Sequence, residues 1–267
     1  MIKIIFSDMD GTLLDAQGCV PDGFEDVAKA LEARGVLFAP TSGRQYFSLL
    51  DSFAPYEQEF LYLADNGTLV MYKGEQLFVS PMKREDAERI LARGAELSGI
   101  YGVFCGTKNG YVRDDQFVPA FRGELHKYYT HTATLPVLVD VPDVPIKVSF
   151  FDPAGHADET IYPYMKEFES EVQVVLASEH WLDIMNPGAN KGAAVRAVQE
   201  HFGIAPDECA AFGDYLNDTE MMGAVGYSFA MGNAHPKIKE IARYTTATNE
   251  EHGVLVGIRR LMEEGLV

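Results

Sequence analysis

Short apolar runs alternate with amphipathic helical patterns at both ends of this chain. Apolar runs at 2–6, 36–40 and 60–64 predict strands bounded by turns, and apolar positions at helical spacing predict a helix over 22–34. The last third predicts further elements: helix 191–202, strand 209–212, helix 217–223, strand 226–230, helix 235–242, strand 244–246 and helix 250–262. This alternation favours an α/β fold with a doubly wound parallel sheet.

The middle of the chain has a different rhythm, in which strand-like runs follow one another closely. A helix is expected at 83–98, and helix-like stretches at about 121–130 and 157–170. The strand-like runs lie at 101–105, 111–113, 137–141, 146–151 and 172–176. We interpret residues 83–185 as an α+β domain that is inserted into a discontinuous α/β domain, made of 1–82 and 186–267.

The charge balance excludes several classes of partner. Asp and Glu number 40 against 22 Lys and Arg, which gives a formal net charge of −18. Such a charge repels phosphate backbones and anionic lipid, so we expect neither nucleic acid nor membrane as a partner. The three cysteines show neither zinc-ligand spacing nor a disulfide framework. Since no signal-peptide pattern precedes the first acids, we expect a cytoplasmic protein, and the sequence predicts no oligomeric state.

Two carboxylates directly follow the first predicted strand. Asp8 and Asp10 belong to the sequence DMDGT, and such a pair can hold a divalent cation and present a carboxylate nucleophile. In this interpretation Asp8 attacks phosphorus and Asp10 exchanges a proton with the leaving group. The alternative is a polar turn, because Asp-Gly is a common turn pair.

Other polar residues are expected at the same edge of the sheet, because parallel strands end there together. Asp214 and Asp218, in GDYLND, follow the strand at 209–212 and could complete an oxygen-rich Mg²⁺ site. Lys191 opens a predicted helix, where an ammonium and backbone N–H groups suit a phosphate. Ser42 and Gly43 offer a hydroxyl and an open backbone amide. Each of these patterns, taken alone, also has a purely structural explanation. GDYLND could cap the next helix, Lys191 could be a surface lysine, and Ser42-Gly43 could be a turn.

In this order, the four pieces resemble the motifs of the haloacid dehalogenase (HAD) superfamily of phosphotransferases. DMDGT resembles its first motif, Ser42 its second, Lys191 its third and GDYLND its fourth. The long insert between Ser42 and Lys191 is similar to that of the type IIB (C2B-capped, Cof-like) phosphatases. The resemblance implies a Rossmann-like core, residues 1–82 and 186–267, with residues 83–185 as an α+β cap.

The resemblance also implies roles for the acidic residues. Asp8 would be the nucleophile and a Mg²⁺ ligand, and Asp10 would bind Mg²⁺ through its backbone carbonyl and act as acid and base. Asp214 would be the third protein ligand of the metal, with Asp218 behind it as support.

The remaining implied roles concern the substrate. Ser42, Lys191 and Asn217 would hold the transferring phosphoryl group, and contacts with the substrate are expected from Gly43, Arg44 and Asn66. The implied activity is Mg²⁺-dependent hydrolysis of a small phosphorylated metabolite, such as a sugar phosphate, through an aspartyl-phosphate.

Three other functions stay open at this point. A phosphomutase of the phosphomannomutase kind would use the same motifs. A phosphoacceptor switch combines aspartates, Mg²⁺, a hydroxyl and a lysine, but it lacks a large insert and an acid at the place of Asp10. A non-catalytic binding protein is disfavoured because no motif position is missing. Among substrates, sugar phosphates, pyridoxal phosphate, nucleotides and flavin mononucleotide all remain.

Overall fold

The computed structural model describes residues 1–267, which form two compact units. One unit consists of Met1–Phe78 and Asn190–Val267, and the other of Val79–Ala189. The sequence pattern placed this division at 82/83 and 185/186, near the same two points. None of the helices is both long enough and apolar enough to span a lipid bilayer.

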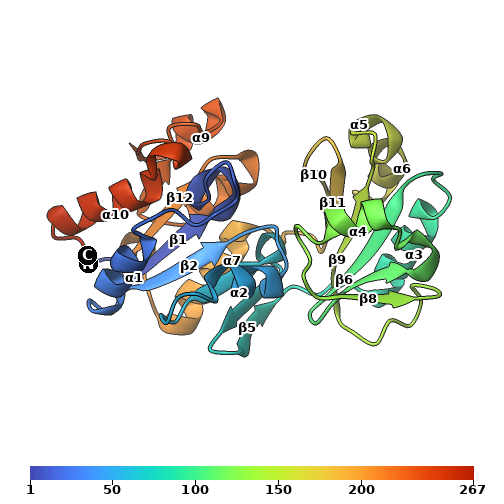
Figure 1. Ribbon diagram of the computed structural model, residues 1–267, viewed down its shortest axis with the longest axis horizontal. Helices are drawn as coiled ribbons and strands as arrows, with labels where there is room; N and C mark the ends of the chain where they lie inside the picture. The colour runs from blue at the N-terminus through green and yellow to red at the C-terminus, as the bar shows by residue number, and fades with distance from the viewer. The chain divides into compact units, whose positions relative to one another are not determined.

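The discontinuous unit is built on an eight-stranded sheet in the order β14-β13-β12-β1-β2-β3-β4-β5 (Figure 1). The strands are β1 (Ile4–Asp8), β2 (Leu37–Thr41), β3 (Leu61–Ala64), β4 (Leu69–Tyr72), β5 (Glu75–Val79), β12 (Cys209–Gly213), β13 (Tyr227–Ala230) and β14 (Tyr244–Thr245). Neighbouring strands from β14 to β3 are parallel, and β4 pairs antiparallel with β3. The predicted doubly wound parallel α/β sheet is therefore confirmed.

Helices cover both faces of this sheet. They are α1 (Phe24–Glu32), α2 (Tyr46–Phe53), α7 (Lys191–Phe202), α8 (Thr219–Gly223), α9 (Pro236–Ile241) and α10 (Gly253–Glu263). On one face Phe24 of α1 packs edge-on against Phe38 of β2 and Phe53 of α2, and α10 packs on α1. Cys209 on β12 points to the opposite face, where it meets Gln199 of α7. The central strands read as nearly continuous apolar runs because both their faces are buried.

The unit Val79–Ala189 contains a six-stranded sheet in the order β10-β11-β9-β6-β7-β8. The strands are β6 (Tyr101–Gly106), β7 (Gly110–Arg113), β8 (Thr132–Leu135), β9 (Pro145–Phe151), β10 (Gln173–Leu176) and β11 (Trp181–Met185). Apart from the parallel pair β7–β8, the neighbours are antiparallel. This pattern confirms an α+β fold for the middle of the chain.

Four helices accompany this second sheet: α3 (Arg84–Gly94), α4 (Pro119–Leu125), α5 (Ala157–Thr160) and α6 (Tyr162–Met165). One face of the sheet forms a core with α3, α5 and α6, in which Ile90, Phe104 and Phe150 are buried. Phe121 of α4 stacks on Tyr101 of β6, which belongs to the other face.

Two of the elements predicted for this unit do not form as expected. Residues 137–141 form bends instead of a strand, and the strand at this edge of the sheet is β8, just before them. Pro136 and Pro142 flank these residues and lack backbone N–H donors, and Asp140 has a positive φ of 51°. The helix predicted over 157–170 is broken into α5, α6 and a 3₁₀ turn, because Pro163 cannot continue the hydrogen-bond pattern of α5.

Candidate active site

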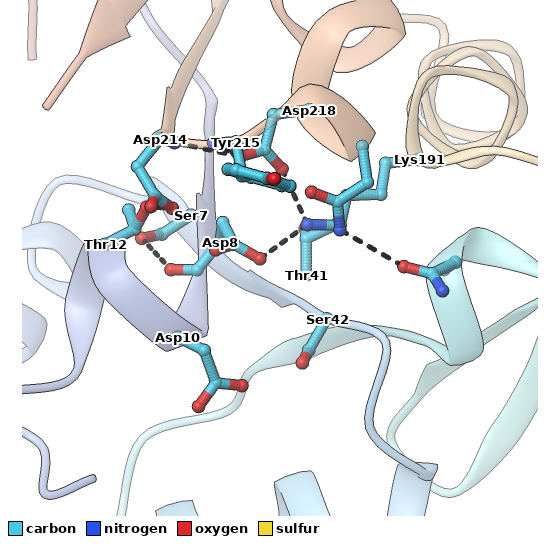
Figure 2. A network of polar contacts seen from close by, with 12 residues as sticks. Ser7, Asp8, Asp10, Thr12, Thr41, Ser42, Lys191, Asp214, Tyr215 and Asp218 are labelled. Atoms are coloured by element: carbon cyan, nitrogen blue, oxygen red, sulfur yellow. Dashed lines mark hydrogen bonds and ion pairs between the residues drawn. The ribbon is translucent and has the colours of Figure 1, made fainter. Parts of the chain in front are cut away.

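Polar residues gather where β1, β2, β3 and β12 end, at one edge of the eight-stranded sheet (Figure 2). The strand register pairs Asp8, the last residue of β1, with Thr41, the last residue of β2. β12 ends at Gly213, directly before Asp214. The parallel ladder thus brings residues that are far apart in sequence to one place, as expected for this class of sheet.

Lys191 forms the centre of the buried charges. Its Nζ donates to Asp8 Oδ1 at 2.5 Å and to Asp218 Oδ1 at 2.6 Å, and its side chain is fully buried. Lys191 is the first residue of α7, and Asn190 caps this helix by accepting a hydrogen bond from the N–H of Ala193 at 2.8 Å. The lysine is therefore held by a capped helix end, where a phosphate would also find free N–H groups.

Asp214 and Asp218 have different surroundings. The hydroxyl of Thr12 donates to Asp214 Oδ1 at 2.8 Å. Asp218 is completely buried, and its Oδ2 accepts the backbone N–H groups of Asp214 and Tyr215 at 2.9 and 3.1 Å. Both oxygens of Asp218 thus already have donors, counting Lys191, which suits a supporting group more than a metal ligand.

Gly11 makes the close approach of the first loop to Asp214 possible. Its φ is +79°, and a Cβ atom there would come within 2.5 Å of Asp214 Oδ2. A glycine therefore satisfies both the backbone conformation and the space at this position.

The charges of this cluster do not balance. Oxygens of Asp8, Asp214 and Asp218 lie within 4.8 Å of one another, and Lys191 supplies a single ammonium against these three carboxylates. Burial raises the pKa of Asp8 well above its ordinary value, with Lys191 opposing the shift and the two other aspartates adding to it. Burial also raises the pKa of Asp214. Burial alone would lower the pKa of Lys191, but Asp218 and Asp8 outweigh it and raise that pKa.

This donor set fits a hard divalent cation. With all groups ionised, three negative charges and one positive charge leave a balance of −2. Carboxylate oxygens are the ligands that Mg²⁺ prefers, and a cation would offset the unfavourable burial of charge on Asp8 and Asp214. Asp8 and Asp214 are the side chains that could bind the ion, and the loop at Asp10 could add its carbonyl.

Asp10 lies apart from this cluster (Figure 2). Both its carboxylate oxygens accept from Arg44, Oδ2 from Nε at 2.9 Å and Oδ1 from Nη2 at 2.5 Å. The Asp10 side chain is 54% exposed, and that of Arg44 is 18% exposed. Arg44, which the sequence placed against the substrate, thus contacts the carboxylate that the sequence assigned to proton transfer.

Ser42 and Thr41 differ in where their hydroxyls point. Thr41 donates back to the carbonyl of Ala39 in its own strand, whereas the Oγ of Ser42 accepts the N–H of Arg44 at 3.1 Å. As an acceptor in this bond, the Ser42 hydroxyl still has its own hydrogen to donate. The structure therefore favours Ser42 over Thr41 as a ligand of a phosphoryl group.

Gly43, Asn66 and Asn217 lie together beside Ser42. The Nδ2 of Asn217 donates to Asn66 Oδ1 at 3.4 Å, and a Cβ atom on Gly43 would lie 3.2 Å from the Asn66 amide. The predicted site residues thus all lie at this sheet edge. The sequence analysis did not predict two interactions, the hydrogen bond from Thr12 to Asp214 and the ion pair between Arg44 and Asp10. The motifs DMDGT and SGR give residue types, but they do not show which residues these contact in the fold.

Comparison with known proteins gives consistent results. Residues 5–258 match the family of haloacid dehalogenase-like hydrolases. The chain is 27% identical over 267 residues to 5-amino-6-(5-phospho-D-ribitylamino)uracil phosphatase of Escherichia coli K12, covering 98% of this chain and 97% of the relative. It is 29% identical to the HMP-PP phosphatase of Cronobacter sakazakii, covering 89% and 87%.

A solved structure of a HAD subclass IIB sugar phosphatase has the same fold. It superposes with a TM-score of 0.78 at 21% identity, covering 99% of this chain and 100% of that one.

Proposed function

This chain belongs to the haloacid dehalogenase-like hydrolase family and is a phosphatase, and on that basis we propose that it hydrolyses small phosphate monoesters through an aspartyl-phosphate on Asp8. The observation that carries the proposal is the placement of Asp8. It ends β1, contacts Lys191 at 2.5 Å and shares the site with Asp214. A nucleophile, a cation and an acid for the leaving group are then available at one sheet edge.

In the first step, Asp8 attacks phosphorus while the bond to the leaving-group oxygen breaks. Lys191 holds Oδ1 of Asp8, so the carboxylate is oriented before the substrate arrives. Asp10 gives its proton to the departing oxygen. In the second step Asp10 takes a proton from water, which attacks the phosphorus and releases phosphate and Asp8.

Positioning and charge have to supply most of the acceleration. Uncatalysed hydrolysis of a phosphate monoester is so slow that enzymes reach accelerations of up to ~10²¹-fold, and proton transfer accounts for only ~10²–10⁴ of this. Lys191, the Ser42 hydroxyl, the Gly43 N–H and the Asn217 amide are the donors that would hold the phosphoryl oxygens. When bound to Asp8 and Asp214, Mg²⁺ would neutralise charge on these oxygens.

The relatives support a small metabolite as the substrate. Two of them are named for a phosphoribitylamino-uracil and for HMP-PP, and the structural neighbour is a sugar phosphatase. We propose a substrate of this size, with 1–82 and 186–267 as the catalytic core. In this proposal 83–185 is a cap that excludes water and selects the leaving group.

A cytoplasmic location is supported by the cysteines, which are all free thiols.

The test is Asp8→Asn, assayed for release of inorganic phosphate from a panel of phosphate esters with Mg²⁺. Loss of the nucleophile should lower kcat by at least about three orders of magnitude. Asp22→Asn, at an exposed acid near the start of α1, is the matched control and should keep full activity. Undiminished turnover by Asp8→Asn would falsify the proposal.

A further inference from the structure

We propose that Arg44 is a positioning residue for Asp10: its guanidinium fixes the place and plane of the Asp10 carboxyl group, which gives a proton to the leaving group and later regains one from water. This inference rests on the proposed function, since it takes Asp10 as the acid. It assigns to Arg44 a role in the bond-breaking step, where the sequence had indicated contact with the substrate.

The geometry of the pair is that of a bidentate clamp. The two guanidinium nitrogens Nε and Nη2 each donate to a different oxygen of Asp10, at 2.9 and 2.5 Å. Two parallel bonds between planar groups fix the orientation of a carboxylate as well as its position. A lysine at this position would offer one point charge and could not fix the plane of the carboxylate.

Asp10 needs an external restraint of this kind. Its side chain is 54% exposed, and it stands on a turn whose backbone at Asp10 is not helical (φ −73°, ψ 119°). Arg44 is the one side chain that bonds to it. Without the clamp, an exposed aspartate would sample several staggered rotamers, of which few would reach the leaving-group oxygen.

The backbone of Arg44 is itself fixed by two hydrogen bonds. Its N–H donates to Ser42 Oγ at 3.1 Å, and its carbonyl accepts the N–H of Asp65, just after β3, at 2.9 Å. These two bonds are made by the backbone, so they persist when the side chain is replaced. A substitution of Arg44 therefore removes the clamp on Asp10 and leaves the loop and the Ser42 contact in place.

The inference makes a prediction that depends on the leaving group. A p-nitrophenolate leaves with little help from an acid, whereas an alkoxide has to be protonated. The measured quantity is kcat/KM, because it reports the transfer to Asp8 and is independent of the later hydrolysis of the aspartyl-phosphate. The two substrates are p-nitrophenyl phosphate and the primary-alkyl phosphate that the unaltered enzyme hydrolyses fastest.

For Arg44→Met we expect kcat/KM to fall by ~10–100-fold with the alkyl phosphate, the size of effect that misplacement of a reacting group causes. With p-nitrophenyl phosphate we expect a fall of less than ~3-fold. Arg44→Lys should recover part of the loss. Arg260→Met is the matched control: it breaks an exposed ion pair between Arg260 of α10 and Glu264, at 2.8 Å, and should leave kcat/KM unchanged with both substrates.

A double-mutant cycle separates positioning from structural damage. If Arg44 acts through Asp10, adding Arg44→Met to Asp10→Asn should cost nothing more with the alkyl phosphate. An equal loss with both substrates would identify Arg44 as a ligand of the phosphoryl group and overturn the inference, as would no loss with either. Failure of the proposed function has a different signature, which is turnover by Asp8→Asn.

Discussion

At the scale of single residues, the chemistry of this site depends on partners that a motif does not reveal. Thr12 is the last residue of DMDGT, and its hydroxyl donates a hydrogen bond to Asp214, which lies 202 positions later in the sequence. Sequence reasoning identified Asp8, Lys191 and Asp214 because each follows a strand or opens a helix. It could not find the Thr12 bond or the Arg44 clamp, since hydrogen-bond partners follow from tertiary contacts and have no period in the sequence.

The Thr12 bond gives a prediction for Asp214. Thr12→Val keeps the shape of the side chain and removes the donor, so one oxygen of the half-buried Asp214 carboxylate loses its partner. The free energy of unfolding should fall by about 1–3 kcal/mol in urea titrations, and the Mg²⁺ concentration for half-maximal activity should rise about 10-fold or more. Thr12→Ser retains the hydroxyl and should resemble the unaltered protein. The role given to this bond is wrong if the serine and valine variants behave alike.

At the scale of elements, helix ends and strand ends carry the site. Helix α7 was predicted over 191–202 and is observed at Lys191–Phe202, because an asparagine cap and a regular apolar pattern define it. By contrast, α2 was missed. The residue before it, Gln45, makes no side-chain capping bond, so the helix has no start signal in the sequence. Strand β11 was missed as well, since a mixed run such as WLDIM shows its alternation only once its neighbours are known.

The cap of α7 can be tested through Lys191, the next residue. Asn190→Ala removes the acceptor for the N–H of Ala193, which should lower the free energy of unfolding by about 0.5–2 kcal/mol. Since the first turn then frays, Lys191 should hold Asp8 less well, and kcat should fall along with stability. Asn190→Ser preserves a capping oxygen and is expected to keep most of the stability and most of kcat. A lowered stability with unchanged kcat would show that the position of Lys191 does not depend on this cap.

At the scale of the whole molecule, the net charge of the chain and the carboxylates of the site both repel an anionic substrate. A net charge of −18 repels any anionic substrate, and three of the carboxylates that contribute to it are gathered at the site itself. Local cations have to reverse this field where the phosphate binds. The residues that could bind a metal all belong to the unit Met1–Phe78 with Asn190–Val267, while Val79–Ala189 has a hydrophobic core of its own. A bound cation should therefore stabilise the first unit specifically.

Thermal unfolding with and without Mg²⁺ tests this expectation independently of turnover. A ligand at 100 times its Kd stabilises the native state by about 2.7 kcal/mol, which corresponds to a rise in Tm of about 5–10 °C for a unit of this size. Salt alone also screens repulsion in so acidic a chain, so the reference is NaCl at the same ionic strength. Asp214→Asn removes a ligand and should abolish the Mg²⁺-specific part of the shift while leaving the NaCl effect intact. If Asp214→Asn retained the full shift, or if NaCl reproduced it, the ion would bind elsewhere or only screen charge, and the assignment of Asp8 and Asp214 as its ligands would be wrong.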